Sequence, residues 1–135
     1  MFSDARHRNC EWLSNPLIKA TSDQLSGGLL TGKYLERPEA IEGSRSAAPG
    51  FAKARFTPGK LAATKAYVDL ARRSGLDPAV MALAFVRQRP FLSSVLLAAS
   101  RVSQLQLNFQ SLDVTLSREL IKEIDVIHDA QPNPK

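Results

Sequence analysis

Three polar residues in the second half of the chain stand at a spacing that could bind an anion. Ser100 follows an apolar run, and Gln104 and Asn108 come after it at successive helical turns, so the three would share one helical face. A helix that begins at Ser100 offers a hydroxyl and free backbone N–H groups, and its dipole favours negative charge there. The pattern indicates a phosphate site. Simple helix capping by Ser100, with Gln104 and Asn108 as plain surface amides, explains the same residues.

The other reactive side chains give little support to nucleophilic catalysis or metal binding. Cys10 and His7 lie near the N-terminus, and His128 stands far from them among acidic residues. A nucleophile needs a base and an orienting group beside it, and a metal needs clustered ligands. We interpret His128 as a cation at a helix C-terminus that interacts with the helix dipole. We therefore predict no catalytic residue and no metal site, and a solvated helix face for Glu119, Glu123 and Asp125.

Length and composition exclude several classes of protein. The chain has 135 residues, enough for one domain, and its 44% hydrophobic and 23% charged residues are typical of a globular protein. A single cysteine cannot form an internal disulfide, so we expect the cytoplasm. No apolar run approaches the roughly 18 residues of a membrane span, and no signal peptide is recognisable. The 18 basic and 13 acidic residues are spread evenly without an aromatic ladder, which argues against nucleic-acid binding.

The elements that would position the polar residues begin in the middle of the chain. Residues before 25 show no sustained periodicity. The many Gly and Pro residues between 26 and 58 favour a long irregular loop and disfavour a helix. Thr57-Pro58 is a typical helix start, and Gly75 closes that helix as a left-handed cap. Its apolar face comprises Leu61, Tyr67, Val68 and Ala71.

A second group of elements leads to Ser100 and beyond it. Asp77-Pro78 starts another helix, whose residues 80–86 are apolar almost all round, so it must be covered on most sides. Residues 91–99 read FLSSVLLAA, a run typical of a strand buried on both faces in a parallel sheet, with its centre at 93–98. Two further helices follow, capped by Ser100 and Ser117. Their apolar positions are Val102, Leu105, Phe109 and Leu112 in the first, and Leu120, Ile121, Ile124 and Ile127 in the second.

Several motifs resemble a known family. They are GGLLTGKY at Gly27–Tyr34, GSR at Gly43–Arg45, the run from Ala66 to Phe91, and Ser100-x-x-x-Gln104-Leu105-x-x-Asn108 followed by Leu116-Ser117. Their order and spacing over residues 25–134 resemble the C-terminal part of aldo-keto reductases, in particular the bacterial subgroup related to potassium-channel β subunits.

The resemblance implies a fold and an activity. Aldo-keto reductases are (β/α)8 barrels that reduce aldehydes and ketones with NADPH, and a barrel needs about 250 residues. The expected fold is α/β, a C-terminal fragment of a TIM barrel, mostly helical with one or two short parallel strands. Residues 1–24 stay unassigned, and residues 25–135 form the C-terminal part of the oxidoreductase domain. The family's catalytic Asp, Tyr, Lys and His lie on earlier strands, so none is carried over, and Lys33, Tyr34, Tyr67 and His128 do not replace them.

The resemblance also assigns cofactor contacts. The lysine of GKY and a downstream arginine approach the phosphates in the family, and they correspond to Lys33 and Arg45. The family's Ser/Thr, Gln and Asn after the last strand hold the 2′-phosphate and adenine, and they correspond to Ser100, Gln104 and Asn108. The expected cofactor is NADP(H), at the anion site that helix physics indicates.

Four positions depart from the family pattern. Asp23-Gln24-Leu25 stands where Ser-Pro-Leu is usual, so Asp23 and Gln24 differ, and a carboxylate there would repel a pyrophosphate. Ala98 stands where a glycine is usual, and Leu107 where a glutamate is common. Together with the unfamiliar residues 1–22, these departures suggest a truncated or remnant reading frame.

A sheet of two strands has consequences for stability and function. Two strands cannot close a barrel, so the strand at 93–98 would leave an apolar face and an edge exposed. We expect marginal stability, and self-association or a complementing barrel half as partner. Three functions follow: an oxidoreductase by descent that is inactive as this chain, a residual nucleotide-binding module, or a subunit-interaction module without catalysis.

Overall fold

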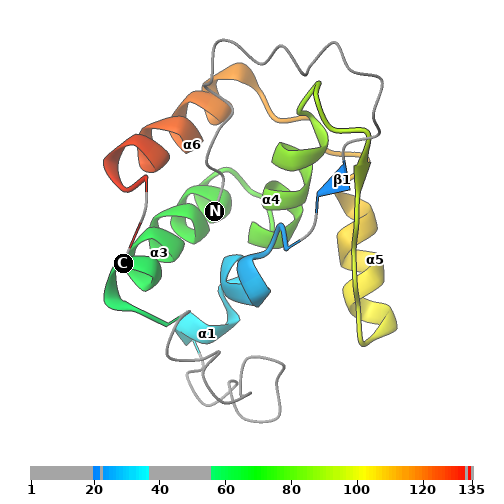
Figure 1. Cartoon of the computed structure of the whole chain (residues 1–135), viewed down its shortest axis with the longest axis horizontal. Coiled ribbons are helices and arrows are strands. Elements are labelled where there is room, and N and C mark those ends of the chain that lie inside the picture. The colour runs from blue at the N-terminus through cyan, green and yellow to red at the C-terminus, as the bar shows by residue number, and fades with distance from the viewer. Residues whose placement is uncertain (1–19, 22, 37–55, 133, 135) are drawn as a thin grey trace.

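The computed structural model describes residues 20, 21, 23–36, 56–132 and 134, and most of them are helical (Figure 1). Two short strands accompany one 3-10 helix and five α-helices among these residues. The elements in chain order are β1 (Ala20–Thr21), η2 (Ser26–Thr31), α1 (Lys33–Glu36), α3 (Pro58–Arg73), α4 (Pro78–Arg87), β2 (Ser94–Val95), α5 (Val102–Gln110) and α6 (Arg118–Ala130).

The two strands form a parallel pair. Ala20 lies opposite Ser94 and Thr21 opposite Val95, and the Leu96 N–H donates to the Thr21 carbonyl at 2.8 Å. The sequence predicts one or two short parallel strands; the described residues form two, and β1 lies in the segment that the sequence left unassigned. A parallel pair matters for function because the chain leaves both strands at the same edge, where α/β folds place their ligands.

The predicted strand at 93–98 is much shorter than expected. Only Ser94 and Val95 have strand structure, and the burial on both faces is wrong: the side chains of Leu96 and Leu97 are 58% and 39% exposed. Of the described elements, β1 pairs with one edge of β2 and α4 packs against it. A fully buried parallel strand needs cover on both faces, which no described element provides. The exposed apolar face is as predicted.

Three helices begin where their capping residues predict. The Thr57 hydroxyl accepts from the Lys60 N–H at 3.4 Å, and the Asp77 carboxylate accepts from the Ala79 N–H at 2.8 Å. The Ser117 hydroxyl accepts from the Leu120 N–H at 3.1 Å. Gly75 has a φ of 71°, the left-handed conformation predicted for the end of α3.

Helix α4 lies at the centre of the core. Every residue from Pro78 to Val86 is buried, as its uniformly apolar sequence predicts. It contacts α3, α5, η2 and β2, and α6 packs on α3 (Figure 1). The apolar face of α6 is inward, with Ile124 buried. The core cluster comprises Leu70, Ala71, Met81, Ala84, Phe85, Val86, Leu116 and Ile124.

The segment after β1 is more regular than predicted. Residues 26–36 form η2 and α1, where the glycine content favoured an irregular excursion; residues 37–55 lie outside the described part of the chain. Gly27 and Gly28 have φ values of 65° and 91° and kink η2 internally. Positive φ is accessible to glycine at low cost, so the chain turns here and buries Leu29 and Leu30.

Candidate functional site: the carboxyl edge of the strand pair

The predicted cofactor residues follow the two parallel strands. Lys33 comes after β1, in the segment that leaves the strand through η2, and Ser100 comes after β2. Because the strands are parallel, both segments start from one edge of the pair. Figure 1 shows α1 and the start of α5 toward the same end of the molecule. The fold thus directs the segment that carries Lys33 and the segment that carries Ser100 to one side.

Ser100 and Gln104 are in direct contact. The Gln104 Oε1 atom accepts from the Ser100 N–H at 3.0 Å and from the Ser100 hydroxyl at 3.1 Å. Both side chains are exposed. The predicted proximity of these two residues is therefore confirmed, and the pair presents a hydroxyl and an amide to solvent.

The prediction that Ser100 caps the following helix is wrong. Helix α5 begins at Val102, and the capping position falls on Arg101, which makes no side-chain capping hydrogen bond. The reason is the return contact from Gln104, which binds the Ser100 hydroxyl and keeps it from the first turn of α5. In contrast to α3, α4 and α6, helix α5 has no capping side chain, and the cationic Arg101 stands at its first turn.

Asn108 differs from Gln104 in its environment. It lies one turn further along α5 and is only 5% exposed, so the interpretation of a plain surface amide does not hold for it. Its backbone carbonyl accepts from the Ser111 hydroxyl at 2.6 Å. The structure thus brings Ser100 and Gln104 together at the surface and sets Asn108 apart in the interior.

Lys33 is held beside an aromatic ring. Its Nζ atom lies 4.6 Å from the centroid of Tyr34, and this exposed ammonium group can make a cation–π contact. Tyr34 is buried and packs edge-to-face on Phe56, with centroids 5.0 Å apart. The Lys33 stem passes over Gly28, where an added Cβ would lie 3.4 Å from Cε. Tyr34 is therefore a support for the lysine that reasoning from the sequence missed, although it is the next residue in the GKY motif.

Arg45 is the second predicted phosphate contact, and Asp23 is the acidic departure from the family pattern. Arg45 lies outside the described residues. The Asp23 carboxylate accepts from the Gly27 N–H at 2.7 Å, and the residue adopts a φ of 63°. Asp23 therefore stabilises the turn that leads into η2, a local role that its sequence position did not reveal.

Tyr67 and Arg89 have shifted pKa values away from this edge. Burial raises the pKa of the Tyr67 hydroxyl, and the carboxylates of Asp125 and Asp129 raise it further. Burial lowers the pKa of Arg89, against an opposing effect of Asp125. The Arg89 guanidinium stacks on Phe85 with its Cζ atom 3.7 Å from the ring centroid. A tyrosine with a raised pKa is a weaker acid, which suits a structural role for Tyr67.

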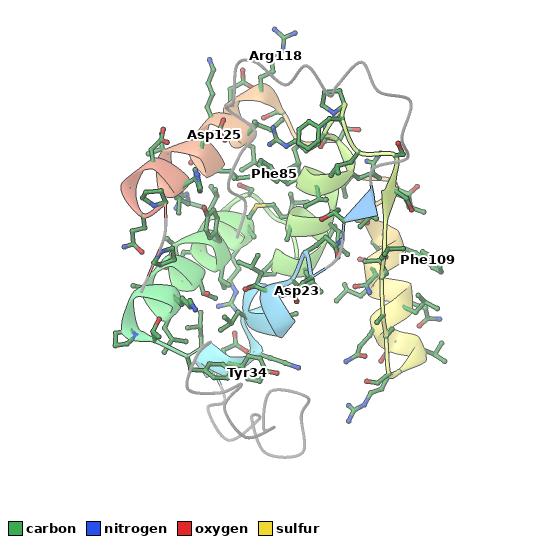
Figure 2. The ribbon with its side chains drawn as sticks, viewed as in Figure 1. Asp23, Tyr34, Phe85, Phe109, Arg118 and Asp125 are labelled. Carbon is green, nitrogen blue, oxygen red and sulfur yellow. The ribbon has the colours of Figure 1, made fainter. Side chains whose placement is uncertain are left out.

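Tyr67 also lines a small apolar cavity inside the helical layer. The cavity is formed by α3, α4, α6 and η2, and Phe85 lies between helices in Figure 2. Of the described residues of the predicted site, none lines it. Its lining residues are Leu30, Tyr67, Pro78, Met81, Ala82, Phe85 and Ile124.

The described residues contain neither a cluster of metal ligands nor a helix that could span a membrane. Within residues 20–21, 23–36, 56–132 and 134, no three His, Cys, Asp or Glu side chains gather as metal ligands would. None of the helices in the described part of the chain is long and apolar enough to cross a bilayer.

Comparison with known proteins gives a consistent result. The chain is 44% identical over 112 residues to Protein tas of Escherichia coli (strain K12), and equally to Protein tas of Shigella flexneri. It is 35% identical over 105 residues to the L-glyceraldehyde 3-phosphate reductase of Escherichia coli O157:H7. These matches cover 82% and 75% of this chain but only 32% and 30% of the relatives. The chain spans about a third of the length of the curated relatives it matches.

The family match reaches further toward the N-terminus than the motifs do. Residues 8–129 match the Aldo/keto reductase family as a whole, whereas the resemblance of individual motifs begins at residue 25. The match includes both strands, every described helix except the last residue of α6, and the predicted cofactor residues. The chain therefore belongs to the aldo/keto reductase family.

Proposed function

We propose that this chain forms the nucleotide-binding part of an NADP(H)-dependent oxidoreductase that reduces carbonyl groups. The family generally uses NADP(H). The observation that carries the proposal is the exposed Ser100–Gln104 pair beside the uncapped start of α5, at the carboxyl edge of the parallel strands. Ligands of α/β folds bind at such edges, and helix N-termini favour phosphate.

The residues at this edge suit a phosphorylated nucleotide. If the Gln104 amide rotates, its Nε2 group and the Ser100 hydroxyl both become donors toward the 2′-phosphate. Lys33 and Arg45 would neutralise the pyrophosphate, whereas Asn108, which is only 5% exposed, would support the site from within α5 and would not touch the adenine. The Asp23 carboxylate accepts from the Gly27 N–H and so has a local role in the turn that leads into η2. The bound cofactor would supply a hydride, and the described residues would contribute binding and orientation.

We further propose that this chain, from β1 onward, is the closing part of a (β/α)8 barrel; residues 25–135 carry the motifs, and the family match from residue 8 takes in most of the segment 1–24 that the motifs left unassigned. A parallel strand pair with helices between the strands is the repeating unit of such a barrel. By family resemblance, the groups that deliver the proton lie on strands outside these residues. The 135-residue chain on its own is then inactive, and measurable NADPH-dependent turnover of a nitrobenzaldehyde by the pure chain would overturn this part of the proposal.

An exposed apolar surface favours a second function, that of an interaction module. The surface comprises side chains from α5 and from the segments between β2 and α5 and directly after α5, and Phe109 projects from the outer side of α5 in Figure 2. Contiguous apolar patches of this kind mark interaction sites. We propose that the rest of a barrel packs here. We call this the α5–β2 apolar surface: Leu96, Leu97, Val102, Leu105, Phe109 and Leu112.

Calorimetric titration with NADPH and NADH tests cofactor binding. We expect NADPH to bind more tightly than NADH, since only NADPH carries the 2′-phosphate. Ser100→Ala should weaken NADPH binding, whereas Ser103→Ala, an exposed serine in the first turn of α5, should not. Equal affinities for the two cofactors would contradict the proposed site. Self-association of the chain in light scattering, reduced by Phe109→Ser, would instead favour the interaction module.

A further inference from the structure

Helix α5 follows Ser100 and carries Gln104 and Asn108 of the proposed site, yet most of its apolar side chains are exposed. Val102 is 73% exposed and Phe109 is 53% exposed. Helix α5 lies against α4, but none of its apolar residues belongs to the core cluster or to the partly buried apolar residues packed against that cluster. Asn108 is the one buried residue of the helix. Because little apolar surface of α5 is buried, we expect hydrogen bonds to contribute much of what fixes α5 relative to the strands.

Two consecutive polar residues at the end of α4 supply that connection. The Arg87 Nε group donates to the Ser111 carbonyl at 3.2 Å, and its Nη2 group donates to the Val114 carbonyl at 2.8 Å. Gln88 binds Leu116 in both directions: the Leu116 N–H donates to Oε1 at 2.9 Å, and Nε2 donates to the Leu116 carbonyl at 3.5 Å. We call these four contacts the Arg87–Gln88 clamp.

The clamp joins α4, the helix buried along nearly its whole length, to the segment that directly follows α5. Helix α4 is buried from Pro78 to Val86, so its C-terminal end is a fixed point. The bound carbonyls and N–H group belong to residues 111–116, between α5 and α6. The Ser111 hydroxyl in turn donates to the Asn108 carbonyl at 2.6 Å, which carries the connection back into α5.

We propose that Arg87 and Gln88 are positioning residues, which hold α5 and with it the Ser100, Gln104 and Asn108 set in register with the strand edge. This inference rests on the proposed function for its effect on cofactor binding. A guanidinium that donates to two carbonyls fixes both position and angle, which a single point charge does not. Loss of the clamp leaves the Ser111 and Val114 carbonyls without these donors, and α5 then moves as a unit on the surface of α4.

Amide hydrogen exchange tests the placement of α5 without any cofactor. Arg87→Ala should speed exchange in residues 102–110 on the order of tenfold relative to the unsubstituted chain, because charged hydrogen bonds are lost. Exchange in α3 should change less. The matched control is Arg73→Ala, which removes an exposed arginine that bonds Glu123 of α6 at 2.8 Å and does not touch α5. Unchanged exchange in residues 102–110 of folded Arg87→Ala would overturn the proposal.

A milder variant keeps the test usable if Arg87→Ala does not fold. Arg87→Lys retains the charge but cannot form the two-carbonyl fork, so we expect faster exchange in α5 with the overall fold preserved. Gln88→Glu keeps the acceptor for the Leu116 N–H and loses the donor to its carbonyl, and it should act in the same direction. Exchange in both variants equal to that of the unsubstituted chain would overturn the proposal.

Cofactor titration distinguishes a failure of the proposed clamp from a failure of the proposed function. We expect Arg87→Lys to weaken NADPH binding several-fold and to narrow the preference over NADH, while Arg73→Ala leaves both unchanged. Faster exchange in α5 with unchanged NADPH affinity would overturn the positioning role. If the unsubstituted chain binds no NADPH, the proposed function fails, and the exchange results alone then support or overturn the placement of α5 by the clamp.

Discussion

The Oε1 atom of Gln104 accepts hydrogen bonds from both the backbone N–H and the hydroxyl of Ser100, at 3.0 and 3.1 Å. One amide oxygen thus holds the two donors that an anion would use. A ligand that binds here competes with Gln104 and has to rotate its amide group. The side chain at position 104 therefore controls whether this edge accepts negative charge.

Gln104→Glu should make this edge reject negative charge. A carboxylate accepts the same two hydrogen bonds but cannot donate by rotating, and it repels a phosphate. We expect the Kd for NADPH to rise on the order of tenfold, with a smaller change for NADH. Calorimetric titration of the two cofactors measures the difference. Gln106→Glu is the matched control, because it adds the same charge at an exposed position of α5 outside the Ser100 contact. Equal effects of the two substitutions would contradict a local role for Gln104.

Two apolar residues of α6 should differ in their contribution to stability. Ile124 is buried in the core cluster, whereas Val126 is 66% exposed. Ile124→Ala should lower the free energy of unfolding by about 2–5 kcal/mol because it leaves a cavity. Val126→Ala should change it by less than about 0.5 kcal/mol. Urea unfolding followed by circular dichroism gives both values, and similar losses would show that α6 does not pack as described.

Two glycines with left-handed backbones should respond differently to alanine. Gly32 and Gly75 have φ values of 77° and 71°, so alanine at either position costs about 1–2 kcal/mol of backbone strain. At Gly32 an added Cβ would also lie 3.2 Å from a methyl group of Val68, whereas at Gly75 nothing lies within 4 Å. We expect Gly32→Ala to be the more destabilising by about 1–3 kcal/mol. Thermal melts of the two variants decide the order.

Tyr67 should make stability depend on pH in the alkaline range. Burial first, and then Asp125 and Asp129, raises its pKa above the ordinary value. A tyrosine in the unfolded chain ionises at a pH of about 10, whereas Tyr67 in the folded chain keeps its hydroxyl proton to higher pH. The stabilisation is therefore fully present below a pH of about 10 and is lost as the pH rises through the folded pKa.

One substitution tests whether Tyr67 causes this dependence of stability on pH. Tyr67→Phe has no hydroxyl proton to lose, so its stability should fall less steeply above a pH of about 10. Urea unfolding at a series of alkaline pH values gives the two slopes. Parallel slopes for both chains would show that Tyr67 does not carry the effect.

Local signals in the sequence predicted three helix starts correctly and one wrongly. Thr57, Asp77 and Ser117 cap α3, α4 and α6, because a cap is a hydrogen bond to an N–H two or three residues ahead. Ser100 carries the same signal but bonds Gln104 instead, and α5 starts beyond it. The sequence contains both partners, yet it does not state which competing contact is made.

The apolar pattern by itself determined that α4 is buried and that α6 has an inward face, because a helix without a polar side must be covered and an amphipathic one must bury its stripe. The resemblance of GGLLTGKY and of the Ser100 motif determined the family. Only the tertiary structure decided that β2 is two residues long, that the stripe of α5 is exposed, and that Arg87 and Gln88 hold the segment after it. Strand length, burial and such cross-chain hydrogen bonds depend on neighbours far away in sequence, and no local pattern of residues specifies them.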